Sequence, residues 1–256
     1  MRVGVMILPD SPWTVARQRW EAVEELGFDS GWTVDHLWWR SLSDSPWYPT
    51  FPFLTAAATV TSRIRLGTMV TTPNFRHPLV VAKDVVGLDD ISGGRFTLGV
   101  GAGSTGAGDA YATDPAVLTA AERYARFGEF VGLVDRLLTE PAVDHQGTFY
   151  SVRGAYMQPG CVQRPRAPLA IAAARPRGQE IAARHGEAWV SCGPLDVSRP
   201  WTQDEFRAAV RDQLAGLAAA GRRVGRDVST MDRIVVTTDL TGELLKSADD
   251  FARHTE

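Results

Sequence analysis

An aspartate and a histidine, Asp35 and His36, directly follow a predicted strand over residues 29–34. In α/β folds the catalytic side chains and the ligands lie at the carboxyl ends of the strands. Histidine titrates near neutral pH, so His36 could transfer a proton while Asp35 orients its ring. The alternative is a packing role, in which His36 contacts Trp38 or binds a backbone carbonyl. We predict that His36 and Asp35 are catalytic.

Two loops of small and polar residues follow strands at one predicted sheet edge. The stretch over 63–104 reads as strand, loop, helix, strand and a glycine-rich exit. Thr71-Thr72-Pro73-Asn74 follows the first strand, and Gly101-Ala102-Gly103 follows the second. In a parallel βαβ unit both loops lie on the edge where α/β proteins bind ligands. Glycine there lets the backbone approach a bound group closely.

The segment that follows His36 is rich in aromatic residues. These side chains could belong to the core, but a proline-punctuated aromatic loop at a ligand edge favours the wall of an apolar pocket. We therefore place three tryptophans, Trp38, Trp39 and Trp47, in the substrate pocket. The same pattern continues with Tyr48, Phe51 and Phe53.

Apolar runs of strand length alternate with segments of helical spacing along the chain. Strands are predicted at 2–8, 29–34, 64–70, 96–100, 168–173, 188–191 and 234–237. Helices are predicted at 12–26, 53–61, 78–91, 116–138, 178–185, 204–220 and 248–254. This alternation predicts a parallel sheet covered by helices. Without a dinucleotide fingerprint after the first strand, it favours an α/β TIM (β/α)8-type barrel over a doubly wound sheet.

The predicted barrel lacks its eighth strand, because the given chain stops at Glu256 within the last predicted helix. We expect one barrel domain over residues 1–256, with an irregular insertion at about 139–166 that is rich in Gly, Pro and Gln.

Composition bears on the possible partners. A formal charge of -3 gives no field that would attract nucleic acid or an anionic membrane. No apolar run approaches the roughly 20 residues of a membrane span. Cys161 and Cys192 lie far apart without a CxxC pattern, which suggests reduced thiols in a cytoplasmic protein. The histidines form no metal-binding cluster, so we predict no metal site.

Five motifs follow one another along the chain: VDHLWW at 34–39, GTMVTTPNFRHP at 67–78, AK....LD.ISGGRFTLGVGAGS at 82–104, GTFYS at 147–151 and VQRPRAPLAIAA at 162–173. Together they resemble the luciferase-like monooxygenase superfamily, the flavin- and deazaflavin-dependent TIM-barrel enzymes related to bacterial luciferase. The resemblance covers essentially the whole chain. Within the superfamily, TVDHLWW and VTTPNFR are most similar to members that use the deazaflavin coenzyme F420.

The resemblance implies an F420-dependent oxidoreductase that transfers a hydride between the deazaflavin and a moderately apolar organic substrate. The cofactor ring would lie over Gly101-Ala102-Gly103 and against a bulge at Met69-Val70-Thr71-Thr72, often with a non-proline cis peptide. The loop over 173–179 would bind the phosphate, and a helix amino terminus beside two arginines suits that role, although these could also be a solvated surface pair. The phosphate-loop residues would be Ala174, Arg175, Arg177, Gly178 and Gln179.

The resemblance leaves alternatives open. Many deazaflavin-dependent members carry a glutamate as proton donor in the loop after the fourth strand, where this chain has Asp109, which we place in the substrate pocket. An FMN-dependent monooxygenase of the same superfamily is the first alternative, because the phosphates of both cofactors can occupy one loop. A non-catalytic relative that binds a cofactor or a partner is the second. By resemblance we also expect a homodimer.

Overall fold

The central element is one curved sheet of seven parallel strands. The computed structural model of the chain describes residues 1–39, 42, 44–103, 112, 118–196 and 199–237. In this part of the chain the sheet order is β1-β2-β3-β4-β7-β8-β9, and every neighbouring pair is parallel. The strands are β1 (Gly4–Met6), β2 (Ser30–Thr33), β3 (Arg65–Thr68), β4 (Phe96–Gly101), β7 (Leu169–Ala172), β8 (Ala188–Ser191) and β9 (Asp232–Val235).

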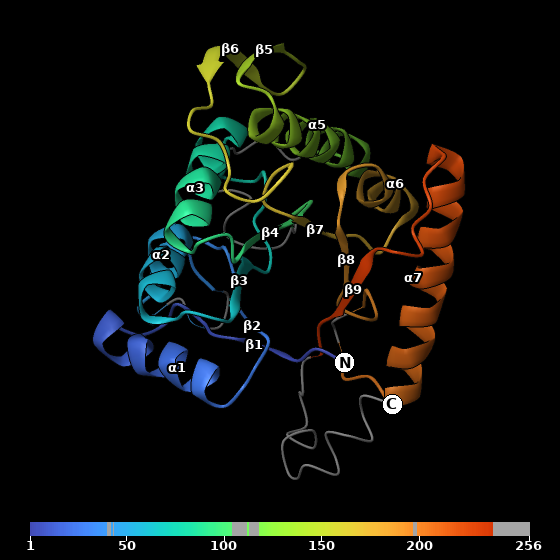
Figure 1. Cartoon of the computed structure of the whole chain (residues 1–256). Helices are drawn as coiled ribbons and strands as arrows, with labels where there is room; N and C mark the ends of the chain where they lie inside the picture. The colour runs from blue at the N-terminus through green and yellow to red at the C-terminus, as the bar shows by residue number, and fades with distance from the viewer. Residues whose placement is uncertain (40–41, 43, 104–111, 113–117, 197–198, 238–256) are drawn as a thin grey trace.

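Helices cover the convex side of the sheet, as Figure 1 shows. They are α1 (Trp13–Glu25), α2 (Thr50–Val60), α3 (Pro78–Ile91), α5 (Ala120–Thr139), α6 (Pro176–His185) and α7 (Gln203–Val224). The predicted α/β barrel-type architecture is confirmed, with the helices alternating with the strands. The helix predicted at 248–254 lies outside the described residues.

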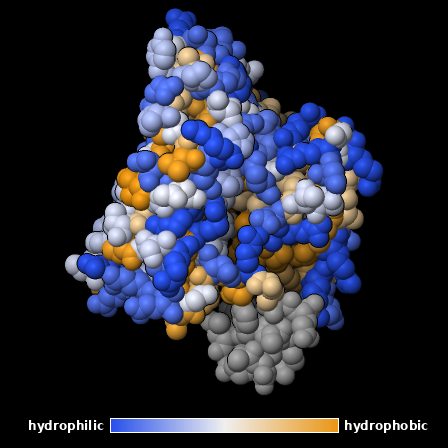
Figure 2. Space-filling view, viewed as in Figure 1, coloured by the Kyte–Doolittle hydropathy of each residue, from blue (hydrophilic) through white to orange (hydrophobic). Residues whose placement is uncertain are grey.

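Apolar side chains pack in two layers on either side of the sheet. The larger cluster joins strands to helices and includes Trp20, Leu54 and Phe127, each fully buried. The smaller cluster comes from the strands and their ends alone, so it fills the concave side; Met69 and Val190 belong to it, with Trp32 packed against them. Figure 2 shows apolar surface in the hollow between the part formed by α1 to α3 and the part formed by α6 and α7.

The insertion predicted to be irregular contains an antiparallel β-hairpin, which corrects the prediction for 139–166. Its strands are β5 (Ala142–Gln146) and β6 (Ser151–Tyr156). Val143, Val152 and Ala155 are buried while their neighbours are exposed, which is the alternation of a half-buried hairpin. The alternation spans only a few residues, and the glycines and prolines around it obscured the strands in the sequence.

A carboxylate of α5 holds this hairpin. Both oxygens of Glu129 accept hydrogen bonds from the backbone N–H groups of the turn at 148–150, the shortest being 2.8 Å from Tyr150 N. The His145 ring nitrogen lies 3.1 Å from the same carboxylate. These donors outweigh the effect of burial and lower the pKa of Glu129.

The last described helix runs one turn further than predicted. Gly221, which directly follows the predicted range 204–220, is buried inside α7, where a Cβ would meet the Arg226 carbonyl and the Val228 side chain. The helix ends instead at Gly225, which has a φ of +72°. Gly221 therefore permits close packing, and Gly225 supplies the left-handed cap.

The two outer strands of the sheet each have one partner. Within the described residues, β1 pairs only with β2 and β9 pairs only with β8, as the predicted lack of an eighth strand implies. Near the amino-terminal ends of both strands, Arg2 and Asp232 form an exposed ion pair at 2.7 Å. The curved sheet therefore brings its first and last strands within reach of one another.

Candidate active site

The carboxyl end of β3 carries a bulge. Gly67 pairs with Thr97, and Thr71 pairs with Val100. The chain therefore advances four residues from Gly67 to Thr71 while β4 advances three. This extra residue defines a β-bulge. The peptide between Met69 and Val70 is cis, as the resemblance implied for this segment. Beyond it Thr71 N donates to Gly99 O at 2.7 Å, and pairing with β4 resumes.

The bulge requires glycine on the facing strand. A Cβ on Gly99 would overlap the Thr68 carbonyl, and one on Gly101 would lie 2.7 Å from a Val70 methyl carbon. At the exit of β4, Gly103 has a φ of +78°, and the side chains of Thr72 and Asn74 occupy the position of its missing Cβ. The two loops predicted to share one edge are therefore in contact.

Two arginines of α5, absent from the predicted site, brace these loops. Arg123 Nη1 donates to the Gly103 carbonyl at 3.2 Å, and Arg126 Nη2 donates to Asn74 Oδ1 at 2.7 Å. The buried Nε atom of each has no acceptor in the described part of the chain. Arg123 and Arg126 lie one helical turn apart on α5. This spacing is the only signal in the sequence that the two act together.

Asp35 is fully buried at the end of β2 and binds an arginine that the sequence analysis did not select. Arg76, from the loop after the bulge, donates to both carboxylate oxygens at 3.1 and 2.7 Å. Its guanidinium lies 5.1 Å from the ring centroid of Phe51 and 5.0 Å from that of Phe75. The Arg76–Asp35 pair therefore fastens the loop after β2 to the loop after β3.

His36 is half-buried beside this pair. Its ring contacts Trp39 edge-on, with centroids 4.9 Å apart, and its carbonyl accepts the Trp47 indole N–H at 2.9 Å. The alternative prediction, a packing role for His36, expected a contact with Trp38. The structure shows His36 in contact with Trp39. Arg76 binds both oxygens of the Asp35 carboxylate. That Asp35 also orients the His36 ring stays a prediction.

The aromatic segment divides into two groups. Trp39 and Trp47 stack with centroids 6.2 Å apart, so two of the three predicted pocket tryptophans lie together, and Trp38 is 40% exposed. Phe51 and Phe53 instead belong to the buried core under α2, which corrects the expectation that they line the pocket. Asp109 lies outside the described residues.

The amino end of α6 offers unpaired donors. Arg175 is the N-cap, no side chain caps the helix, and Pro176 has no N–H, which leaves the N–H groups of Arg177 and Gly178 without an intrahelical acceptor. Any side chain at Gly178 would press on Tyr124, because its Cβ would lie 3.2 Å from that ring. Ala174 precedes this turn and is half-buried.

The predicted phosphate-loop side chains differ in their surroundings. Arg175 and Arg177 are exposed, and neither has an ion-pair partner among the described residues. Gln179 is buried and donates its side-chain amide to the Gln213 carbonyl at 2.8 Å. Its side chain therefore anchors α6 to α7, while the two arginines stay available to an anion.

The described residues offer neither a metal-binding group nor a membrane-spanning helix. No three His, Cys, Asp or Glu side chains there are grouped so that they could hold a metal ion. No helix in that part of the chain is long and apolar enough to cross a membrane. Cys161 and Cys192 are free thiols, the first buried and the second exposed.

Known proteins resemble the chain in sequence and in structure. It is 38% identical over 175 residues to an F420-dependent glucose-6-phosphate dehydrogenase of Beutenbergia cavernae, covering 65% of this chain and 49% of the relative. It is 32% identical over 224 residues to the Microbacterium testaceum protein of the same name, covering 84% of this chain and 61% of the relative. The chain thus spans about half to three fifths of these relatives.

A solved structure covers the whole chain. A monooxygenase from Streptomyces bottropensis superposes with a TM-score of 0.75 at 26% identity, covering 100% of this chain and 78% of that one. The family model described as luciferase-like monooxygenase matches residues 1–250. The bulge at the end of β3, the strand order and these matches agree, and the chain belongs to the luciferase-like monooxygenase family.

Proposed function

We propose that the chain is an F420-dependent oxidoreductase that transfers a hydride between F420 and a moderately apolar organic substrate. The observation that carries the proposal is the bulge at Met69–Thr72 packed on glycines of β4, in a chain whose relatives are named F420-dependent. Glycine at 101 and 103 lets the bulge and its loop pack directly on the backbone of β4, and a site built of backbone and small side chains suits a planar ring.

The residues at the amino end of α6 fit the phosphate of such a cofactor. The N–H groups of Arg177 and Gly178 are unpaired, and the arginines at 175 and 177 add positive charge beside them. Anions bind helix amino termini because the free N–H groups and the helix dipole both favour negative charge. Ala174 and Gln179 complete the loop, and Gln179 fixes its position through α7.

F420, when bound, supplies the hydride chemistry, and the chain supplies position and proton transfer. We assign the proton to the His36 ring, held by Trp39 and by the Trp47 bond to its carbonyl. Asp35, clamped by Arg76, fixes the backbone that carries His36. Trp38, Trp39 and Trp47 form the substrate wall in this proposal.

An FMN-dependent monooxygenase is the second candidate. The similarity to the Streptomyces bottropensis monooxygenase favours it, at an identity of 26%. A phosphate at the start of α6 would serve FMN equally well, so the two candidates differ in the ring.

Fluorescence titrations of the purified chain with F420 and, separately, with FMN test the proposal. We expect micromolar saturation with F420 and much weaker binding of FMN. The reverse order would favour the monooxygenase and make His36 a substrate-pocket residue. Binding of neither cofactor would contradict both candidates and favour a non-catalytic relative.

The proposal includes a homodimer in the cytoplasm. The dimer rests on resemblance to the family, and the location on two thiols that are both free. Sedimentation at micromolar concentration should give the mass of two chains. A single monomeric species would contradict the dimer.

A further inference from the structure

An aromatic pair lies at the start of α7, beside the loop that follows β8. The rings of Trp201 and Phe206 stack with their centroids 6.1 Å apart, at an interplanar angle of 29°. The Trp201 indole N–H donates to the Asp196 carbonyl at 2.6 Å, so a stack and a hydrogen bond together orient this ring. Leu195 precedes that carbonyl and is 55% exposed. We call the three apolar side chains, Leu195, Trp201 and Phe206, the β8 shelf.

The shelf rests on the backbone at the carboxyl end of β8. Gly193 has a φ of +72°, and a Cβ there would overlap the Phe206 ring. The ring therefore packs directly on the Gly193 backbone, two residues after the strand ends at Ser191. In α/β folds, ligands bind at the carboxyl ends of the parallel strands. The shelf thus lies on the same edge of the sheet as the bulge and the proposed phosphate loop.

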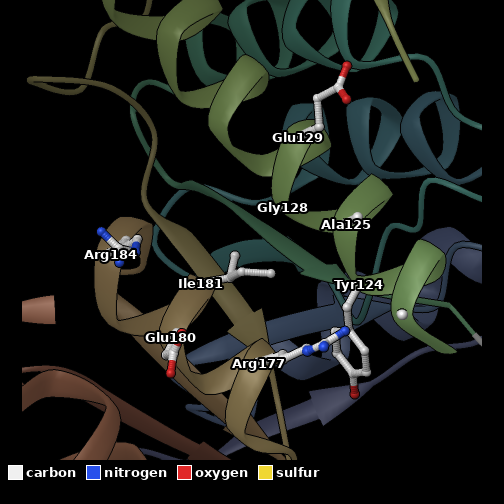
Figure 3. A pocket seen from close by; sticks show the side chains of 9 residues that line it. Tyr124, Ala125, Gly128, Glu129, Arg177, Glu180, Ile181 and Arg184 are labelled. Atoms are coloured by element: carbon white, nitrogen blue, oxygen red, sulfur yellow. The ribbon is translucent and has the colours of Figure 1, made fainter. Parts of the chain in front are cut away.

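A chain of buried polar groups joins the shelf to the proposed phosphate loop. Figure 3 shows Arg177 of that loop on the first turn of α6, and Gln179 follows it on the same helix. The Gln179 side-chain amide donates to the Gln213 carbonyl of α7 at 2.8 Å. The Gln213 side chain accepts from Ser191 Oγ at 2.7 Å and donates to the Gly193 carbonyl at 2.8 Å. Because these groups are buried and bonded to one another, they fix the shelf relative to the phosphate loop.

The shelf also borders the concave side of the sheet. Val190 belongs to the apolar cluster of that side, and the alternation of β8 places Cys192 on the same side, where it is exposed. β2 and β8 lie second from the two ends of the curved sheet. The loop after β8 therefore stands opposite the tryptophan loop after β2, across the hollow whose apolar surface Figure 2 shows.

The arginine beside the shelf is already paired. Arg199 donates to the two carboxylate oxygens of Glu205 at 3.2 and 2.7 Å. A phosphate or carboxylate placed on the shelf would have to compete with Glu205 for this guanidinium. Trp201 and Leu195 instead offer apolar surface, and an uncharged ring that packs on it removes both surfaces from water.

We propose that the β8 shelf forms the second wall of the substrate site and selects an uncharged cyclic substrate, whose ring packs against Trp201 and Leu195. The inference rests on the proposed function and adds the substrate class to it: a neutral alicyclic or aromatic compound, and not a phosphorylated sugar. Trp201 and Leu195 then determine specificity without touching the cofactor.

The test is the protection of Cys192 from alkylation by iodoacetamide, with oxidised F420 present at saturation. Cys161 is buried and serves as the internal reference, since these two are the only cysteines of the chain. Desolvation of its sulfur raises the pKa of the Cys192 thiol, so the labelling is run at mildly alkaline pH.

Cyclohexanone and tetralone are the uncharged probes, and glucose 6-phosphate, which appears in the names of two relatives, is the charged one. We expect both ketones to slow the alkylation of Cys192 relative to F420 alone. Tetralone should act at the lower concentration, because its second ring adds apolar surface. Glucose 6-phosphate should have no effect.

Trp201→Ala should raise the half-protecting concentration of tetralone by about threefold to tenfold, the range of one aromatic contact, and leave the dissociation constant of F420 unchanged. Trp201→Phe should retain most of the affinity, because it keeps a ring at this position. Leu195→Ala should raise the same concentration by about twofold to threefold. Its matched control is Leu26→Ala, which removes a leucine that is 76% exposed at the end of α1 and should have no effect.

Two results would overturn the shelf proposal while the cofactor assignment stands. One is that the ketones give no protection, or none beyond that given by glucose 6-phosphate. The other is that Trp201→Ala weakens the binding of F420 as much as that of tetralone, which would make the ring a purely structural element. Failure of the wild-type chain to bind F420 would overturn the proposed function, and the substrate class with it.

Discussion

The contact that fixes the candidate site most firmly joins Asp35 to Arg76. Asp35 is fully buried, and both of its oxygens accept hydrogen bonds from the one guanidinium. Removing one member of a buried ion pair leaves the other charged and unpaired in a low-dielectric environment. Breaking the pair is therefore costly mainly because it leaves one buried charge unpaired, and less because the attraction between the two charges is lost.

Arg76→Ala should destabilise the chain by about 3 kcal/mol, because Asp35 would remain buried without a partner. Urea denaturation followed by tryptophan fluorescence measures the change. The double variant Asp35→Leu with Arg76→Met should lose less stability than Arg76→Ala alone, since no charge is left unpaired. Additive losses in the double variant would show that the two side chains act independently.

His36→Ala separates proton transfer from binding. With any substrate that the wild-type chain turns over with F420, kcat should fall about 100-fold, the lower range for loss of a general acid or base. The dissociation constant of F420 should stay within about twofold, because His36 lies in the loop after β2, away from the proposed phosphate site. Unchanged turnover with intact binding would remove His36 from the mechanism and leave its contact with Trp39 as its role.

At the scale of elements, Glu24 joins two helices to the start of a strand. Its carboxylate accepts hydrogen bonds from the backbone N–H groups of Ser62, Arg63 and Ile64 at 2.9, 2.7 and 3.0 Å. Burial opposes ionisation, but these donors outweigh it and lower the pKa of Glu24 from 4.5 to about 2. The interaction connects the end of α1 to the turn between α2 and β3.

This lowered pKa predicts a pH dependence of stability. A carboxylate with a depressed pKa stabilises the folded state above its unfolded pKa, and the contribution disappears as the pH falls from 4.5 towards about 2. Glu24→Gln should destabilise the chain by about 1–3 kcal/mol at neutral pH and flatten the fall in stability below pH 4.5. Glu25→Gln, an exposed neighbour, is the control and should change neither. A parallel pH profile in Glu24→Gln would contradict the assignment.

Some helices and strands could be predicted from the sequence, and others could not. The strand over 96–101 and the helix that begins at Pro78 were predicted within a residue or two, because apolar periodicity and proline are local signals. The hairpin of β5 and β6 was missed, since its alternation is short and carries glycine. The bulge followed from the family resemblance, whereas the bonds from Arg76 to Asp35 and from Arg126 to Asn74 join residues 41 and 52 positions apart and leave no local pattern.

At the scale of the whole molecule, the curved sheet closes only in part. Arg2 and Asp232 join the regions of the first and last described strands, and their side chains are 66% and 58% exposed. Water and salt screen such a pair, so it contributes little. The curvature must then come from the packing of the two apolar layers, on the helix side and on the concave side.

Arg2→Ala should accordingly lower the free energy of unfolding by less than about 1 kcal/mol. Urea denaturation of the variant, with Arg233→Ala as an exposed control on β9, measures the difference. A loss of several kcal/mol would show that this pair maintains the curvature of the sheet.

The strand order has a consequence for synthesis on the ribosome. Each strand from β2 to β4 pairs with the strand just before it, and β7, β8 and β9 then extend the same edge in turn. No strand has to be inserted between two that have already paired. Because the amino-terminal residues are synthesised first, we expect the β1–β4 half to be available for pairing first and to serve as the template on which the later strands are added.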